Sequence, residues 1–337
     1  MKHLRFLLCL ALAVTLLTAC GPKGDGSASS SGGGSSVSSS GSGSDPEPAP
    51  APASLTLAAC LSDSFHPVLG TNRSNLTLAP LLYEPLFQLD ETFQPVPVLC
   101  SQAASTDGLI WELTLREGIT FSDGSPLTGS VAADALNTAR QSARYAQRLR
   151  DVSSISGQGN VVTVTLVRAN GNLPALLDIP IVKSGTEESL TPVGTGPYYF
   201  TTDEAGACLA SHSGWWRGES RPAERIALSA ARDREAILYQ FSSHEVQLIT
   251  ADLIGTEPIT ATGNISYEDA DTTVLQFLGF NTARAPFQDS AARRALGLGI
   301  NREPLVSAVL SGHARAAQFP VSPVSPLYPA ELESLYS

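Results

Sequence analysis

The residues that could carry out catalysis or hold a metal are few and scattered in this chain. Four histidines lack the close spacing of metal ligands, and a turn or surface role is expected for each of them: His66, His212, His244 and His313. No Gly-x-Ser-x-Gly elbow, phosphate-binding P-loop or His-Glu-x-x-His motif is present. The neighbouring Glu187 and Glu188 lie in polar loop sequence, which favours solvation over acid–base catalysis. The sequence therefore predicts neither an enzyme nor a resident metal or cofactor.

Cys20 has surroundings that predict a covalent modification. A short cationic stretch precedes an almost unbroken apolar run from residue 6 to 17. Spanning a bilayer takes roughly 20 apolar residues, so this run suits a signal peptide better than a membrane span. The residues Leu-Thr-Ala then lead into Cys20 in a pattern that resembles a bacterial lipobox. We expect residues 1–19 to be a signal peptide and Cys20 to carry a lipid, with an ordinary secretory signal as the alternative.

Residues 20–53 are expected to form the lipidated cysteine and a disordered tether. They are mostly Ser and Gly, with a Pro-rich end, and cannot bury enough apolar surface to offset the entropy of ordering. Flexible-coil scaling gives a mean reach of about 30 Å. The remaining residues are enough for one large or two ordinary domains. No later stretch approaches 18 apolar residues, so no second membrane span is expected.

Charge and cysteine content restrict the partners and the redox chemistry. The net charge of −11 argues against a nucleic-acid partner, because binding to phosphates needs a basic surface. Cys60, Cys100 and Cys208 remain after the N-terminal segment, and their spacing does not suggest zinc. Three buried free thiols are the preferred interpretation, and a disulfide between Cys60 and Cys100 is the alternative in an exported protein.

Strand and helix patterns alternate along the body and predict a mixed α/β fold rather than an all-β sandwich. The most regular strand pattern runs from 109 to 116, with apolar and polar residues in strict alternation. Asp123 and Gly124 predict a tight turn. Thr128 or Ser130 is the expected N-cap of a helix that extends to about residue 149. Further strands are expected at 54–61, 161–167, 198–201, 207–211, 225–230, 245–250 and 271–280, and helices at 76–86, 173–177, 233–241, 290–300 and 302–310.

Six ordered sequence blocks together resemble the extracytoplasmic solute-binding proteins of family 5, which serve peptide- and nickel-type ABC importers. Residues 111–128 are similar to the family's signature almost position for position. The run Gly-Thr-Gly-Pro at 194–197 would be weak alone, and its glycines are expected to permit sharp backbone turns. The blocks cover nearly the whole body and lie at 82–86, 94–99, 111–128, 192–198, 279–296 and 300–303.

The resemblance implies an α/β fold like that of the type II periplasmic binding proteins. Residues 54–270 would form the first lobe of mixed sheets with helices, with 54–95 and 190–270 as a core subdomain and 96–189 as an inserted subdomain. Residues 271–337 would be the hinge crossing and the incomplete start of a second lobe, since family members continue well past this point. A truncated gene product, a fragment and a reduced relative all remain open.

The resemblance also implies a binding protein rather than an enzyme. It would capture a short peptide or similar small solute outside the cell membrane, where a lipid on Cys20 anchors it, and deliver that solute to the permease and ATPase of an ABC importer. Ligand sites of this kind prefer domain interfaces, and an extended peptide can pair with an exposed strand. A relative that has lost transport and a secreted hydrolase are the alternatives. The expected ligand-binding residues follow the first strand or lie on the crossing strand: Ser62, Asp63, Phe65, His66, Phe277, Gly279, Phe280 and Asn281.

Overall fold

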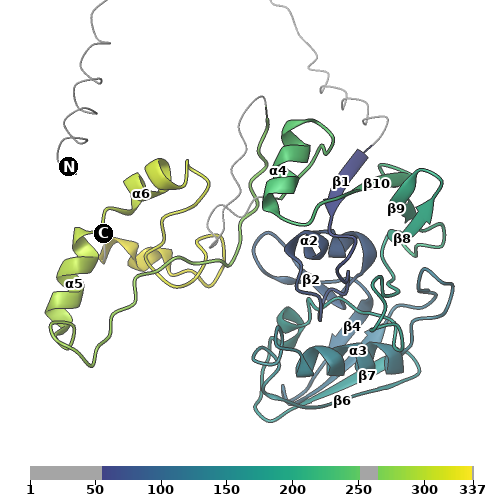
Figure 1. Cartoon of the computed structure of the whole chain (residues 1–337). Helices are drawn as coiled ribbons and strands as arrows, with labels where there is room; N and C mark the ends of the chain where they lie inside the picture. Colours follow the sequence, from purple (N-terminus) through teal and green to yellow (C-terminus); the bar gives the residue numbers. More distant parts are fainter. Residues whose placement is uncertain (1–54, 251–264, 336–337) are drawn as a thin grey trace, which may run out of the picture. The chain divides into compact units, whose positions relative to one another are not determined.

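The computed structural model describes residues 55–250 and 265–335 (Figure 1). The chain divides into two compact units, residues 1–50 and 51–337, and every described residue belongs to the second. The expected signal peptide, Cys20 and tether lie outside the described residues. Within the described residues, the helices are all too short or too polar to cross a membrane.

One four-stranded sheet combines strands that are far apart in the sequence. Its order is β1-β10-β9-β8, with β1 parallel to β10 and the other pairs antiparallel. Helix α2 (Arg73–Leu82) contacts β1 and β8, and its Leu82 joins Leu57 and Leu209 in the core of this sheet. The strands are β1 (Leu55–Ala59), β8 (Tyr198–Asp203), β9 (Gly206–Ser211) and β10 (Arg225–Ala230).

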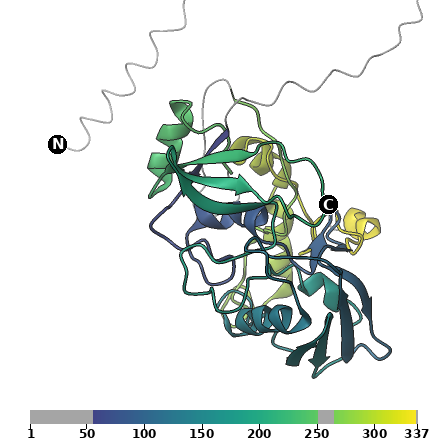
Figure 2. The ribbon, with the colours of Figure 1, turned by 90° about the vertical axis from the view of Figure 1, so that its right-hand side faces the viewer.

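A second four-stranded sheet is antiparallel throughout and lies between β1 and β8 in the sequence. Its order is β4-β5-β7-β6, and α3 (Gly129–Gln141) contacts β6 and β7 (Figure 2). Alternate residues of β5 and β7, such as Leu113 and Val162, are completely buried in the same core as Leu136 of α3, because successive side chains of a strand point to opposite faces. The strands are β4 (Cys100–Ala104), β5 (Ile110–Leu115), β6 (Val152–Gln158) and β7 (Val161–Leu166).

Short elements connect and flank the two sheets. Strands β2 and β3 pair antiparallel beside the second sheet. Helix α4 (Arg234–Ser242) follows β10 and is capped by the Asp233 side chain, which accepts a hydrogen bond from the Ala236 N–H. Helices α5 and α6 follow residue 281, and neither buries a residue. The remaining bounds are β2 (Phe87–Leu89), β3 (Pro95–Pro97), η1 (Leu173–Leu176), α5 (Ser290–Gly299), α6 (Arg302–Val309) and η2 (Ala330–Leu335).

Most of the expected elements are confirmed, and Thr128 is the N-cap of α3 as expected. The helix ends at Gln141 rather than near residue 149, because the Ser142 N–H and hydroxyl both bond to the carbonyl of Ala139 and turns follow. The strands β4 and β6 were not expected, since their polar residues obscure the alternation. The division of 54–270 into a core and an inserted subdomain, and the lobe boundary at 270, stay predictions.

Two expected strands are wrong. Residues 245–250 make a single bridge, between Leu248 and Leu57. Next to this bridge, the Gln247 side-chain oxygen accepts a hydrogen bond from the Thr56 N–H of β1 at 2.8 Å, in place of a main-chain partner. Residues 271–280 form no regular strand. An apolar run becomes a strand only where its main-chain groups pair with a neighbour, and no strand of the described part pairs with this one.

Candidate functional site

The loop after β1 carries four of the expected ligand-binding residues, and a buried amide determines its shape. Asn75 of α2 is 1% exposed. Its Oδ1 accepts from the Cys60 N–H at 2.9 Å, and its Nδ2 donates to the carbonyls of Cys60 and Asp63 at 2.8 and 3.0 Å. One side chain therefore provides hydrogen bonds to both sides of the loop, which fixes its backbone.

Three of the four predicted loop residues occupy different surroundings. Ser62 is exposed, with its hydroxyl 3.4 Å from the thiol of Cys60. Asp63 is also exposed, and its carboxylate accepts from the Asn72 amide at 3.0 Å. Phe65 is buried, with its ring 5.4 Å from that of Phe200. Ser62 and Asp63 are therefore accessible to a ligand, whereas Phe65 is part of the core.

His66 supports the loop from inside. It is 2% exposed, and its Nδ1 accepts from the N–H groups of Val68 and Leu69 at 3.1 and 3.2 Å. A nitrogen that accepts two hydrogen bonds carries no proton, so the neutral ring has its proton on Nε2, which has no partner among the described residues. Burial lowers the pKa of His66, and the negative charge of Glu187 acts in the opposite direction. A neutral, structural His66 follows.

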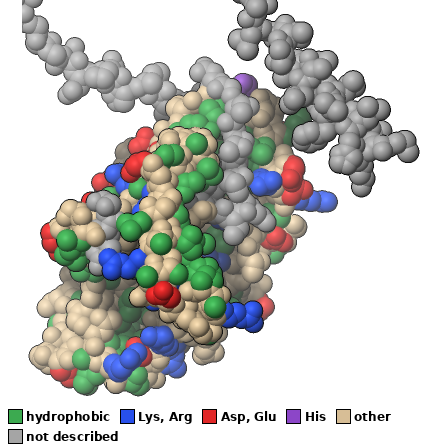
Figure 3. All heavy atoms as spheres, turned by 90° about the vertical axis from the view of Figure 1, so that its left-hand side faces the viewer, with side chains coloured by type: hydrophobic (Ala, Val, Ile, Leu, Met, Phe, Trp, Pro, Cys, Tyr) green, Lys and Arg blue, Asp and Glu red, His purple; other side chains and the backbone are tan. Residues whose placement is uncertain are grey.

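The second predicted group lies in an extended, exposed segment. Phe277 is 80% exposed, and the Phe280 ring is 5.0 Å from that of Phe287. The Asn281 amide oxygen accepts from the Ala283 N–H at 3.0 Å. Gly279 has open space around it except for the Phe277 ring. Figure 3 shows hydrophobic side chains spread over one face of the molecule, and exposed apolar residues are numerous in the described part after residue 265.

A cavity of about 1220 Å³ lies among other residues. Its wall combines apolar side chains such as Phe241, Leu248 and Leu275 with charged ones such as Asp271 and Arg315. None of the eight predicted ligand-binding residues lines it. The structure gathers Ser62 to His66 in one loop but does not bring the two predicted groups into this wall. Their shared contact with one ligand stays a prediction.

Two ion pairs in the cavity wall were not singled out from the sequence. Arg315 donates from Nε and a terminal nitrogen to the two carboxylate oxygens of Asp271, at 2.8 and 3.1 Å. His313 Nδ1 is 2.8 Å from the Asp269 carboxylate, and its ring lies 4.8 Å from that of Tyr267. The partners are 44 residues apart in the sequence, so their spacing gave no signal.

A metal centre does not emerge from the residues that the structure describes. Among them, no group of three or more His, Cys, Asp or Glu side chains is placed to hold a metal ion. Cys60, Cys100 and Cys208 are buried free thiols. Burial raises the pKa of Cys100 to about 11, so its thiol is protonated at neutral pH and is a poor metal ligand.

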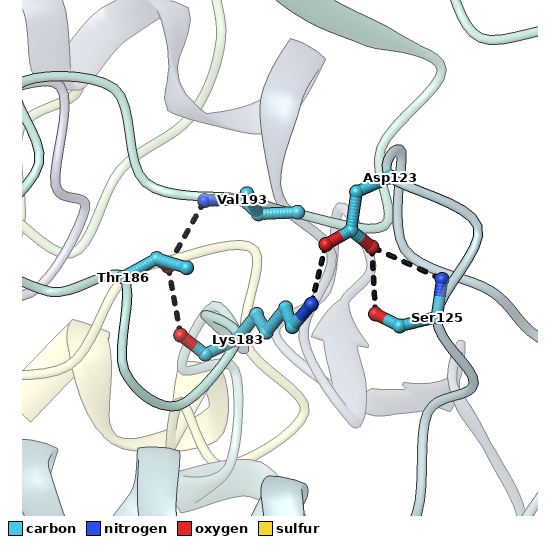
Figure 4. A network of polar contacts seen from close by, with 5 residues as sticks. All are labelled: Asp123, Ser125, Lys183, Thr186 and Val193. Atoms are coloured by element: carbon cyan, nitrogen blue, oxygen red, sulfur yellow. Dashed lines mark hydrogen bonds and ion pairs between the residues drawn. The ribbon is translucent and has the colours of Figure 1, made fainter.

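The turn at Asp123 is joined to the segment from Lys183 to Val193 by a network of polar contacts (Figure 4). The Asp123 carboxylate pairs with the Lys183 ammonium and accepts from the Ser125 hydroxyl and N–H, at 2.6 and 3.0 Å. Thr186 continues the network, because its hydroxyl donates to the Lys183 carbonyl and accepts from the Val193 N–H. The turn is thus anchored as well as closed.

This network predicts a pH-dependent contribution to stability. Partial burial alone would raise the pKa of Asp123, but the hydrogen bonds from Lys183 and Ser125 outweigh it and lower the pKa from 3.8 to about 2. The contribution is therefore present above pH 4 and disappears as the pH falls toward 2. Its size is about 1 kcal/mol, because the carboxylate is 37% exposed and screened by solvent.

Urea denaturation of wild type and Asp123→Asn across this pH range provides the measurement. The difference in unfolding free energy should shrink as the pH approaches 2. When Lys183→Met is introduced first, the further substitution Asp123→Asn should change the free energy of unfolding much less at neutral pH, because the ammonium that pairs with the carboxylate is gone. A difference that stays constant from pH 7 to 2.5 would contradict the assignment.

Comparison with known proteins identifies a family and similar folds. Residues 94–336 match the family described as bacterial extracellular solute-binding proteins, family 5 Middle. The glutathione-binding protein GsiB of Escherichia coli K12 is 26% identical over 265 residues, covering 73% of this chain and 51% of that protein. The corresponding protein of Salmonella paratyphi A is 24% identical over 263 residues, with the same coverage. The chain thus spans about half the length of the curated relatives that it matches.

Solved structures share the fold at lower identity. A nickel ABC transporter protein from Bacillus halodurans superposes with a TM-score of 0.60 at 22% identity, covering 80% of this chain and 57% of that one. The oligopeptide-binding protein AppA from Bacillus subtilis, in complex with a nonapeptide, gives 0.55 at 19% identity, with coverage of 82% and 59%. These likenesses confirm the expected α/β fold of the type II periplasmic binding proteins.

Proposed function

Because the chain belongs to the bacterial extracellular solute-binding proteins of family 5, we propose that it is the substrate-binding component of an ABC importer and binds a short peptide or similar small solute. The role in an importer is supported by the match of residues 94–336 to this family. The ligand class is supported by the relatives, since GsiB is named for glutathione and AppA holds a nonapeptide, and both ligands are peptides. A metal ligand is less well supported, because the described residues offer no metal-binding group.

The cavity gives this proposal a physical basis. Ligand sites are concave, mostly apolar and usually about 300–1,000 Å³, with a few polar groups that fix orientation. The cavity of about 1220 Å³ is somewhat larger than this range and combines apolar walls with a small number of charged side chains, a combination that suits a peptide. Ser62, Asp63 and Asn281 are exposed, and we propose that they also contact the ligand.

We place the protein outside the cytoplasmic membrane, attached by a lipid on Cys20. The lipobox-like residues before Cys20 and the Ser/Gly/Pro-rich residues after it support this location. A flexible reach of about 30 Å would let the folded body approach a permease in the same membrane. Radiolabelled palmitate should enter the wild-type chain and not Cys20→Ser when both are expressed in bacteria. Equal labelling would disprove the anchor.

Isothermal titration of the full-length chain with di- to hexapeptides, glutathione and Ni²⁺ complexes tests the function. At least one peptide should bind with a dissociation constant on the order of 1 μM or lower, which corresponds to about −8 kcal/mol. Mass spectrometry should recover the peptide intact, because a transport protein releases its ligand unchanged. Binding by none of these compounds would overturn the proposal, and turnover of the peptide would indicate an enzyme.

A further inference from the structure

The two ion pairs in the cavity wall have a regular arrangement. Asp269 and Asp271 lie on one segment and pair with His313 and Arg315, respectively, on another. The two carboxylates are two residues apart, and so are their partners, so the wall presents a row of carboxylates beside a row formed by the His313 imidazole and the Arg315 guanidinium. Both rows line the cavity together with the apolar Val274. Opposite charges are therefore presented side by side at a hollow surface.

The Asp271–Arg315 pair is accessible enough to be opened by a ligand. Arg315 keeps 61% of its side chain exposed and Asp271 keeps 34%. An ion pair with this exposure contributes little to stability, because water solvates both charges well when they separate. A ligand that supplies one charge to each partner therefore replaces the pair without leaving a charge uncompensated.

The short separation of the two partners restricts which ligands fit. The Arg315 nitrogens and the Asp271 oxygens are 2.8 and 3.1 Å apart, so a ligand whose ammonium and carboxylate lie close together bridges the two side chains with the smallest displacement from these positions. An α-amino-acid head group meets this condition, because both charges are attached to one carbon atom. The two ends of an ordinary dipeptide are separated by a peptide bond and do not.

We propose that Asp271 and Arg315 bind an α-amino-acid head group, with the carboxylate of Asp271 accepting from the ligand's ammonium and the guanidinium of Arg315 donating to the ligand's carboxylate. The guanidinium fork matches a carboxylate in two parallel hydrogen bonds. The Tyr267 and His313 rings, 4.8 Å apart, provide an aromatic surface beside it. This inference rests on the proposed function and narrows its ligand to free amino acids and peptides joined through a side-chain carboxyl.

Two isomeric dipeptides distinguish this head group from peptide ends in general. In γ-glutamyl-alanine the glutamate keeps its ammonium and carboxylate on one carbon, whereas in α-glutamyl-alanine that carboxyl forms the peptide bond. Titration of the full-length chain should show tighter binding of the γ isomer by about tenfold or more, as expected for one charge-assisted contact. Equal affinity for the two isomers, or preference for the α isomer, would overturn the proposal.

Variants of the two residues test whether the ligand binds at this pair. They also distinguish an incorrect binding site from an incorrect proposed function. Arg315→Gln and Asp271→Asn should each lower the affinity for γ-glutamyl-alanine by about tenfold or more, without changing the melting temperature of the protein. Arg225→Gln is the matched control, since Arg225 makes a similar bidentate pair with Asp203 outside the cavity, and should leave affinity unchanged. If both cavity variants bind with wild-type affinity, Asp271 and Arg315 are not the binding site, although the proposed function stands. If neither a peptide of any length nor a free amino acid binds the wild type, the proposed function itself fails.

Discussion

Glu84→Ala is expected to lower the free energy of unfolding by about 2–3 kcal/mol, because hydrogen bonds to a charged group contribute about 1.5–3 kcal/mol and the partners left behind are only partly buried. The Glu84 side chain is 7% exposed. Its carboxylate accepts from the indole N–H groups of Trp215 and Trp216 at 3.3 and 2.8 Å and lies 3.7 Å from Arg217 Nε. Burial raises the pKa of Glu84, and the hydrogen bonds from both indoles and the charge of Arg217 act against that rise.

The alanine variant would leave two indole donors and a cation without their acceptor. It would also loosen a stack in which Arg116 and Arg217 lie 5.2 and 5.0 Å from the centre of the Trp216 ring. Because Glu84 follows α2, Trp216 follows β9 and Arg116 follows β5, the cluster links elements of both sheets. Its loss should therefore reduce global stability rather than loosen one loop.

Chemical denaturation followed by tryptophan fluorescence measures this effect. Glu84→Gln keeps an acceptor of similar size and should lose less than the alanine variant. Glu112→Ala is the control, because Glu112 is exposed on β5 and its loss should change stability by no more than about 0.5 kcal/mol. A loss below 1 kcal/mol for Glu84→Ala would show that the cluster contributes little to the folded state.

The sequence predicted the elements in which hydrophobic period and local caps agree. Strand β7 buries every second residue, and α3 begins after the Thr128 cap, so both could be located from local pattern alone. Residues 271–280 are as apolar as a strand, but strand formation depends on a pairing partner, which local sequence does not specify. The strand expected at 271–280 is wrong for this reason, whereas at 245–250 a neighbouring strand is present and the pairing stops after one bridge.

Site residues were harder to predict because their roles depend on tertiary contacts. The sequence located the polar loop after β1 but could not show that His66 faces inward or that Asn75 fixes the loop. Asp271 and Arg315 meet across 44 residues, and nothing in their spacing indicates a pair. Glu84 did carry a signal, since it lies in a block shared with the family, but that signal did not reveal its indole partners.

The Gly-Thr-Gly-Pro run shows a different limit, because the chain does bend at Gly196 and Pro197, but the main reason for its glycines was not visible in the sequence. Freedom to turn was expected, yet neither Gly194 nor Gly196 has a positive φ. Both pass the carboxyl end of α2, where the Gly196 N–H donates to the Leu82 carbonyl at 3.0 Å. A Cβ on Gly194 would lie 2.1 Å from the Leu82 oxygen, and one on Gly196 2.5 Å from the Leu82 carbonyl carbon. Close backbone approach, rather than left-handed geometry, excludes a side chain here.

Gly194→Ala should therefore destabilise the protein by about 3 kcal/mol, at the upper end for inserting one carbon into a packed site. The obstructing atom belongs to the backbone of α2, so the helix end or the 192–197 segment must move. Gly171→Ala is the matched control, since a Cβ there meets nothing within 4 Å, and its effect should stay within about 0.5 kcal/mol. Denaturant titration of both variants measures the difference. Equal stabilities would mean that the segment shifts freely, and close approach would then not explain the glycine at position 194.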